Sequence, residues 1–166
     1  MIFLVFFIMQ FCEFLTPSSV FIDSAAQSKT AVLLKLSQIL SQNHPELNAE
    51  ALFDAYWKRE SLGSTTIGHG IIIPHIRAET INKTCGCFLK LLNPVDFGAA
   101  DKQPVDLVLG FVVPQGQNDQ HLQILGKSIK QFSMPEYRNA YRKAENSESL
   151  YALLIEHSYK VCATPE

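Results

Sequence analysis

Residues 105–113, with the sequence VDLVLGFVV, make up a nearly continuous apolar run. Such a run is typical of a strand that is buried on both faces of a sheet. Two more strands are predicted on its N-terminal side, at Ile71 to Ile73 and at Cys85 to Leu92. Pro74 and Pro114 end two of the three strands, because proline lacks the N–H group that a strand ladder needs.

Helical patterns flank these strands on both sides in the sequence. Apolar residues recur three and four positions apart, between residues that commonly start or end helices. The predicted starts and stops are, in chain order, Ser28, Asn43, Asn48, Gly63, Asn118 or Asp119, Pro135 and Ser147. The side chains expected to face inward are Val32, Leu36, Ile39, Leu40, Leu52, Ala55, Tyr56, Leu122, Leu125, Ile129, Phe132, Leu150, Leu153 and Leu154. This order predicts an α/β or α+β domain with a mixed β-sheet flanked by helices.

The size and charge of the chain limit its class. Its 166 residues, of which 47% are hydrophobic, fit one domain of ordinary size. Fourteen Lys and Arg against sixteen Asp and Glu give a formal net charge of −2. We expect no nucleic-acid partner and no contact with anionic lipid, because both require a basic footprint. A protein or a small anion is the expected partner.

The chain starts with nine apolar residues, MIFLVFFIM. A membrane-spanning helix needs about 20 apolar residues, and Glu13 and Pro17 interrupt this run too early. A signal peptide carries a basic residue ahead of its apolar core, whereas the first basic residue here is Lys29. We therefore interpret the run as a buried or disordered extension, with a signal or membrane contact as the alternative.

The four cysteines are Cys12, Cys85, Cys87 and Cys162. Their spacing matches neither a structural zinc site nor a disulfide framework, so we expect a reduced, cytoplasmic chain. Cys85 and Cys87 are interpreted as small apolar residues on one face of a core strand.

Unusual residues gather between Gly63 and Arg77, in the sequence GSTTIGHGIIIPHIR. The first half resembles a phosphate loop, but His69 and Gly70 stand where Lys and Ser or Thr are required. The stretch is therefore not a nucleotide site of that type. It places His75 directly after a predicted strand and a proline.

An imidazole that is neutral near pH 7 is a nucleophile and can carry a phosphoryl group, which makes His75 the main candidate. Ser64, Thr65, Arg59, Arg77 and the nearby glycine amides are all groups that can hold phosphate oxygens. The alternative is a structural histidine that bonds the backbone at a strand end.

His121 is the second candidate, because it follows another strand that ends in proline and lies in the first turn of the next predicted helix. If the two strands are parallel neighbours, His75 and His121 meet over one pocket. Otherwise His121 is an exposed residue near a helix cap.

We expect no metal in this site, since His69, His75 and His121 lack the spacing of common catalytic zinc ligands. His44 is interpreted as a loop residue and His157 as a residue near a helix C-terminus, without functional roles.

These residues resemble one family, the EIIA proteins of the bacterial phosphoenolpyruvate-dependent sugar phosphotransferase system, of the fructose/mannitol type. The resemblance is strongest to the nitrogen-regulatory branch, and the string G-S-T-x-I-G-x-G-I-x-I-P-H, residues 63–75, carries most of it. Further matches are Leu15-Thr16-Pro17, Ser28-Lys29, Arg59-Glu60, Gln103 to Leu107, Val113-Pro114 and His121-Leu122. The resemblance implies an apolar extension at 1–10, an EIIA domain at 11–160 and a short tail at 161–166.

The resemblance also implies roles for single residues. His75 matches the histidine that is phosphorylated at Nε2 by an HPr-like phosphocarrier protein, His121 matches the second active-site histidine, and Arg59 matches an arginine that steadies the phosphate. Such a transfer needs no metal, nucleotide or other cofactor. Two residues depart from the family pattern, His69 and Ile76, and Ile76 is expected to crowd the phosphate.

The function implied is that of a cytoplasmic phosphocarrier, a phosphotransferase-system component with a regulatory output of the nitrogen or potassium type rather than sugar uptake. Its expected targets are a transporter or a kinase. Two alternatives remain at this point. One is a sugar-specific EIIA that passes phosphate to an EIIB, and the other is a binding module of the same fold that is not phosphorylated.

Overall fold

A computed structural model describes residues 10–163, so most of the predicted extension at 1–10 and the last three residues of the predicted tail at 161–166 lie outside the described residues. A mixed six-stranded sheet forms its centre, in the order β1-β5-β6-β3-β2, with β4 also paired to β6. The mixed sheet is as predicted. The strands are β1 (Val20–Asp23), β2 (Thr66–Gly68), β3 (Ile71–Ile72), β4 (His75–Ala78), β5 (Cys85–Val95) and β6 (Val105–Pro114).

Strand β6 is the middle of the sheet. It pairs antiparallel with β5 and parallel with β3 and β4. Val108 and Val112 belong to the core on one face of the sheet, and Leu109 and Phe111 belong to the core on the other. Alternation of this kind follows from the two-residue period of a strand, and it confirms that the apolar run at 105–113 is buried on both faces.

Strands β3 and β4 are one interrupted strand. Both keep the same register against β6, with Ile71 opposite Leu107 and His75 opposite Phe111. Pro74 lies between them and cannot donate to the ladder. His75 follows β3 and Pro74, as predicted, but it is also the first residue of β4, a strand that the sequence pattern did not predict, because the pairing with β6 resumes at this position.

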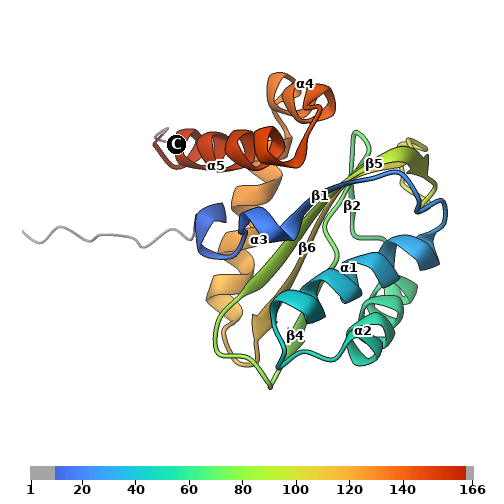
Figure 1. Cartoon of the computed structure of the whole chain (residues 1–166), viewed down its shortest axis with the longest axis vertical. Coiled ribbons are helices and arrows are strands. Elements are labelled where there is room, and N and C mark those ends of the chain that lie inside the picture. The colour runs from blue at the N-terminus through green and yellow to red at the C-terminus, as the bar shows by residue number, and fades with distance from the viewer. Residues whose placement is uncertain (1–9, 164–166) are drawn as a thin grey trace, which may run out of the picture.

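Helices cover both faces of the sheet (Figure 1). Helices α1 (Lys29–Asn43) and α2 (Ala49–Leu62) pack on one face, while α3 (Asn118–Phe132), α4 (Pro135–Lys143) and α5 (Ser147–Ala163) contribute to the core on the other. Short 3-10 helices, at Phe11–Glu13 and Pro17–Ser19, precede β1. The predicted caps of α1 and α2 are confirmed: Ser28 Oγ accepts from Ala31 N at 3.1 Å, and Asn48 Oδ1 accepts from Ala51 N at 2.9 Å.

Helix α3 differs from the prediction. Its N-cap is Gln117, which makes no side-chain cap bond, rather than Asn118 or Asp119. Leu122 and Ile129 were expected inside but are 65% and 45% exposed. The buried face instead includes Gln131, whose Nε2 donates to Tyr141 Oη at 2.8 Å and to Leu154 O at 3.2 Å. The amide nitrogen of this buried polar side chain is thus satisfied, whereas its Oε1 is buried without a partner among the described residues.

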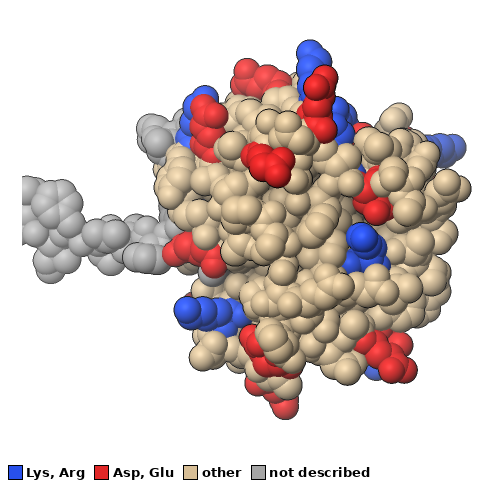
Figure 2. Space-filling model, viewed as in Figure 1, with Lys and Arg blue, Asp and Glu red and all other residues tan. Residues whose placement is uncertain are grey.

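The surface shows neither a membrane-spanning helix nor a patch of one charge among the described residues on the face seen in Figure 2. Among the described residues, none of the helices has the length and apolar character needed to cross a membrane. On the face seen in Figure 2, acidic and basic side chains lie interspersed rather than gathered by sign.

Candidate functional site

A cavity of about 510 Å³ lies where β4, α2 and the start of α3 meet. It brings together four of the predicted site residues, His75, His121, Arg59 and Arg77. The lining residues are Ala55, Lys58, Arg59, Leu62, His75, Ile76, Arg77 and His121. None of these lining residues is acidic, and three of them carry a positive charge, so the cavity suits an anion.

The backbone fixes the His75 ring. Its Nδ1 lies 2.7 Å from the carbonyl oxygen of Ile73. A carbonyl can only accept a hydrogen bond, so Nδ1 carries the proton and donates it. In the neutral ring, Nε2 then keeps an unshared electron pair. The ring also stacks on Phe111, with centroids 5.5 Å apart and an interplanar angle of 20°.

The surroundings of His75 favour its neutral form. Burial lowers the pKa of His75 from its usual value, and Arg59 and Arg77 lower it further by repulsion between positive charges. The hydrogen bond to Ile73 and the carboxylate of Glu60 act in the opposite direction but do not reverse the shift. A neutral imidazole with a free Nε2 is the form that can act as a nucleophile.

His121 faces His75 from the first turn of α3. The two ring centroids are 4.7 Å apart, and the rings meet edge to face at 67°. The two histidines were expected to meet only if their strands are parallel neighbours, and β4 and β6 are parallel neighbours. Burial lowers the pKa of His121 to about 4, with further contributions from His75, Arg77 and Arg59. Its Nδ1 is buried and has no hydrogen-bond partner among the described residues.

Helix α2 supplies Arg59 and is pinned to the sheet one turn earlier. The hydroxyl of Tyr56 donates to the carbonyl oxygen of Phe111 at 2.9 Å, in the core beneath the His75 ring. Residues three positions apart share a helix face, so this bond holds the α2 face that carries Arg59 against β6. Arg59 Nη1 in turn donates to Gly63 O at 2.9 Å at the end of the helix.

Ser64 and Thr65 do not line this cavity. Thr65 is buried and its hydroxyl donates to Glu60 Oε2 at 2.6 Å, while its backbone N–H donates to Glu60 Oε1 at 3.1 Å. Ser64 Oγ lies 2.7 Å from Thr66 Oγ1. Both hydroxyl groups therefore have protein partners, Glu60 at the end of α2 for Thr65 and Thr66 at the start of β2 for Ser64.

The glycine-rich turn belongs to a second cavity, of about 490 Å³, that also contains Asp101 and Arg142. Gly68, His69 and Gly70 all have positive φ, and His69 N donates to Asp101 Oδ2 at 2.8 Å. Histidine is among the side chains enriched in this left-handed conformation. His69 therefore serves the β2–β3 turn, whereas Ile76 does line the His75 cavity.

Several residues of the site were not singled out from the sequence. Lys58 and Leu62 line the cavity, and Phe111 supports the His75 ring. The only feature of the sequence that could have pointed to Lys58 and Leu62 is their closeness to Arg59, which they precede by one residue and follow by three. Phe111 could be found only from the register that places it opposite His75.

Comparisons with known proteins agree on one family. The family model described as "Phosphoenolpyruvate-dependent sugar phosphotransferase system, EIIA 2" matches residues 13–157. A nitrogen regulatory protein from Pseudomonas aeruginosa is 33% identical over 144 residues, which cover 87% of this chain and 94% of that protein.

Solved structures of similar proteins share the fold. The nitrogen regulatory protein IIA-Ntr of Neisseria meningitidis matches with a TM-score of 0.79 and 30% identity, covering 86% of this chain and 97% of that one. The structure of a complex of enzyme IIA mannitol with phosphorylated enzyme IIB mannitol from Escherichia coli matches with a TM-score of 0.70 and 18% identity, covering 84% of this chain and 96% of the matched one.

Proposed function

Because the chain belongs to the EIIA 2 family of the phosphoenolpyruvate-dependent sugar phosphotransferase system, we propose that it carries a phosphoryl group on Nε2 of His75. The observation that carries this proposal is the 2.7 Å contact between His75 Nδ1 and the Ile73 carbonyl. That contact assigns the ring proton to Nδ1 and leaves Nε2 as the nucleophile. A purely structural histidine would make the same hydrogen bond to the backbone, but here this bond also leaves Nε2 available for reaction.

The reaction exchanges one N–P bond for another. The electron pair of His75 Nε2 attacks the phosphorus of a phosphohistidine on an HPr-like carrier protein, and the electron pair of the breaking N–P bond returns to the carrier's imidazole. The proton stays on Nδ1 of the His75 ring, and Nδ1 keeps its hydrogen bond to the Ile73 carbonyl oxygen. No metal or nucleotide is needed for this exchange, because the phosphorus is already activated on the donor.

The cations of the cavity stabilise the phosphoryl oxygens. Arg59, Arg77 and Lys58 line the cavity, and an arginine can bind two phosphate oxygens at once. His121 is neutral near pH 7, because burial lowers its pKa to about 4. We assign to it an N–H donor role toward a phosphoryl oxygen rather than the role of a cation, since its ring meets His75 edge to face at 4.7 Å.

Apolar side chains beside the cavity provide a docking surface for the carrier. Leu62 is 80% exposed and lines the cavity, and Leu122 follows His121 with 65% exposure. Exposed apolar residues around a charged centre are typical of protein interfaces. Transfer between two histidines requires such docking, which also keeps water away from the phosphorus. We place this exchange in the cytoplasm.

We propose a regulatory output in nitrogen or potassium-type signalling, through a transporter or a kinase as the target. The names of the relatives support this, since the P. aeruginosa and N. meningitidis proteins are nitrogen regulatory proteins. The mannitol complex supports a second candidate, transfer from His75 to an EIIB. Incubating the phosphorylated protein with purified EIIB proteins separates the two, because only the second predicts rapid loss of the label to an EIIB.

The decisive test supplies enzyme I, an HPr-like carrier and phosphoenolpyruvate, then maps the modified residue. We expect phosphohistidine at position 75, no label in His75→Ala, and slower labelling at the same residue in His121→Ala. His69→Ala is the matched control and should label as the wild type does, because His69 lies in the other cavity. An unlabelled wild type with an active carrier would instead favour a binding module, in which Ile76 blocks the cavity that it lines.

A further inference from the structure

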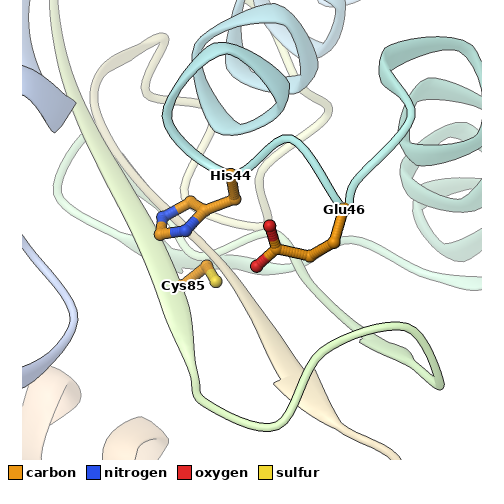
Figure 3. Close-up of side chains that lie close together, drawn as sticks. All are labelled: His44, Glu46 and Cys85. Carbon is orange, nitrogen blue, oxygen red and sulfur yellow. The ribbon is translucent and has the colours of Figure 1, made fainter.

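Three side chains with metal-binding atoms lie close together outside the His75 cavity. His44 follows α1, Glu46 lies in the connection between α1 and α2, and Cys85 starts β5. Figure 3 shows the imidazole, the carboxylate and the thiol directed into one space between that connection and the strand. One ligand atom from each residue lies within 4.8 Å of the other two.

The ligand atoms of this cluster are available. Within residues 10–163, neither the His44 ring nor the Glu46 carboxylate makes a hydrogen bond or an ion pair. The Cys85 thiol donates one weak hydrogen bond, to the carbonyl oxygen of Lys83 at 3.5 Å. The backbone is held nonetheless, because His44 N donates to Leu40 O at 2.9 Å and Leu47 N donates to His44 O at 2.8 Å. The backbone positions are thus fixed, while the His44 ring and the Glu46 carboxylate have no partner among the described residues and the Cys85 thiol has one hydrogen bond that metal binding would replace.

A thiolate, an imidazole and a carboxylate together form a ligand set typical of zinc. Four tetrahedral ligands at about 2.0–2.3 Å from zinc lie roughly 3.3–3.8 Å from one another. The cluster must therefore contract by about 1 Å. Glu46 is exposed and His44 is half-buried, so both can rotate toward Cys85, which is 2% exposed and fixed in the sheet.

We propose that His44, Glu46 and Cys85 form a zinc site that ties the α1–α2 connection to the start of β5. The exposed position of Glu46 leaves the fourth coordination position to a water molecule. The inference goes beyond the proposed phosphotransfer and does not rest on it.

Binding replaces a proton by the metal. Burial, together with the charge of Glu46, raises the pKa of Cys85 to about 11, so the thiol is protonated without metal. On binding, the S–H bond breaks, its proton leaves to solvent, and the sulfur electron pair forms the bond to zinc. The two positive charges of zinc then offset the negative charges of the thiolate and of Glu46.

The site lies near the phosphoryl site without sharing residues with it. Cys85 is opposite Val112, and Val112 is opposite Ile76, so the three form one row across β5, β6 and β4. Cys85, Val112 and Ile76 all belong to the packing on the α1 and α2 face. Zinc bound to Cys85 would therefore stabilise one end of this row, while Ile76, which follows His75 in the chain, lies at the other end.

The test uses the full chain, stripped of metal with a chelator and titrated with zinc against a competing indicator. We expect one equivalent of zinc in the wild type and binding weakened at least about tenfold in His44→Gln and in Glu46→Gln, since losing even an outer partner of a metal ligand costs roughly 10–100-fold. Cobalt(II) serves as a second probe, because a sulfur ligand adds a charge-transfer absorption band. This band should vanish in Cys85→Ser.

Matched controls make the result decisive. Glu50→Gln changes an exposed carboxylate nearby, and Cys12→Ser removes an exposed thiol; both should bind zinc as the wild type does. His44→Gln and Glu46→Gln alter residues outside the core and keep the test valid if Cys85→Ser fails to fold. Zinc binding that is unchanged in these two variants overturns the proposal. Binding that is lost in His75→Ala also overturns it, because the metal would then sit between the two histidines of the phosphoryl site.

Discussion

Lowering the pH should destabilise the protein through His121. The pKa of His121 falls from 6.5 to about 4 on folding, chiefly because the ring is buried. The folded pKa is the lower one, so the unfolded chain binds the proton first as the pH falls. The stability present above pH 6.5 is thus lost as the pH falls toward the folded pKa of about 4.

The size of this loss follows from the shift. Between pH 6.5 and about pH 5 the unfolded ring is protonated and the folded ring is not, which gives a ceiling of about 2 kcal/mol at 1.36 kcal/mol per pH unit. His121 is only half-buried, and solvent screening reduces the effect to about 1 kcal/mol. His75 adds a loss of the same sign, because burial lowers its pKa as well.

Urea unfolding of the wild type and of His121→Gln, each at about pH 7 and at about pH 5, measures the effect. The free energy of unfolding of the wild type should fall by about 1 kcal/mol more than that of the variant. His69→Gln is the control, since His69 is exposed, and it should follow the wild type. An equal fall in the wild type and in His121→Gln would refute the claim that folding holds His121 neutral.

Three further predictions follow from the same site and its support. Tyr56→Phe removes the hydrogen bond to Phe111 O, and urea unfolding should show a free energy of unfolding that is lower by about 1 kcal/mol. Phosphoryl transfer should also be slower, because the helix face that carries Arg59 is held less firmly against β6. An unchanged transfer rate would contradict this positioning role of Tyr56. Gly70→Ala places a Cβ 2.8 Å from Arg142 Nη2 and puts alanine at a φ of +79°. This clash and backbone strain should lower the free energy of unfolding by about 2–3 kcal/mol and leave His75 as the phosphorylated residue. A loss below about 0.5 kcal/mol, the scatter for ordinary surface changes, would contradict the strain at this position. The rate of phosphoryl acceptance from a prephosphorylated carrier should stay constant above pH 6.5 and fall only below it, because the pKa of His75 is lowered from 6.5; a midpoint above that value would contradict the neutral-ring account.

The sequence predicts the centre of the fold well, for a physical reason. The run at 105–113 and the cysteines at 85 and 87 carry enough apolar or alternating residues to identify buried strands, and the helix caps Ser28 and Asn48 are local hydrogen bonds. Strands β1 and β2 are only four and three residues long. Such short strands have no period of their own and exist because β5 and β3 offer edges to pair with.

The candidate site divides in the same way. The proline after Ile73 makes His75 visible in the sequence, whereas the proton assignment on its ring depends on a carbonyl two residues away that only the folded chain brings to 2.7 Å. Ser64 and Thr65 have the chemistry to hold phosphate, but Glu60 and Thr66 occupy them first. Competition between partners of similar chemistry is decided by tertiary geometry, which no residue pattern contains.

The most direct test of the central claim is NMR of the phosphorylated protein labelled with nitrogen-15, which identifies the ring nitrogen bonded to phosphorus. We predict phosphorus on Nε2 of His75, with Nδ1 still protonated and hydrogen-bonded to the Ile73 carbonyl oxygen. Phosphorus on Nδ1 of His75, or on any residue other than His75, would contradict it.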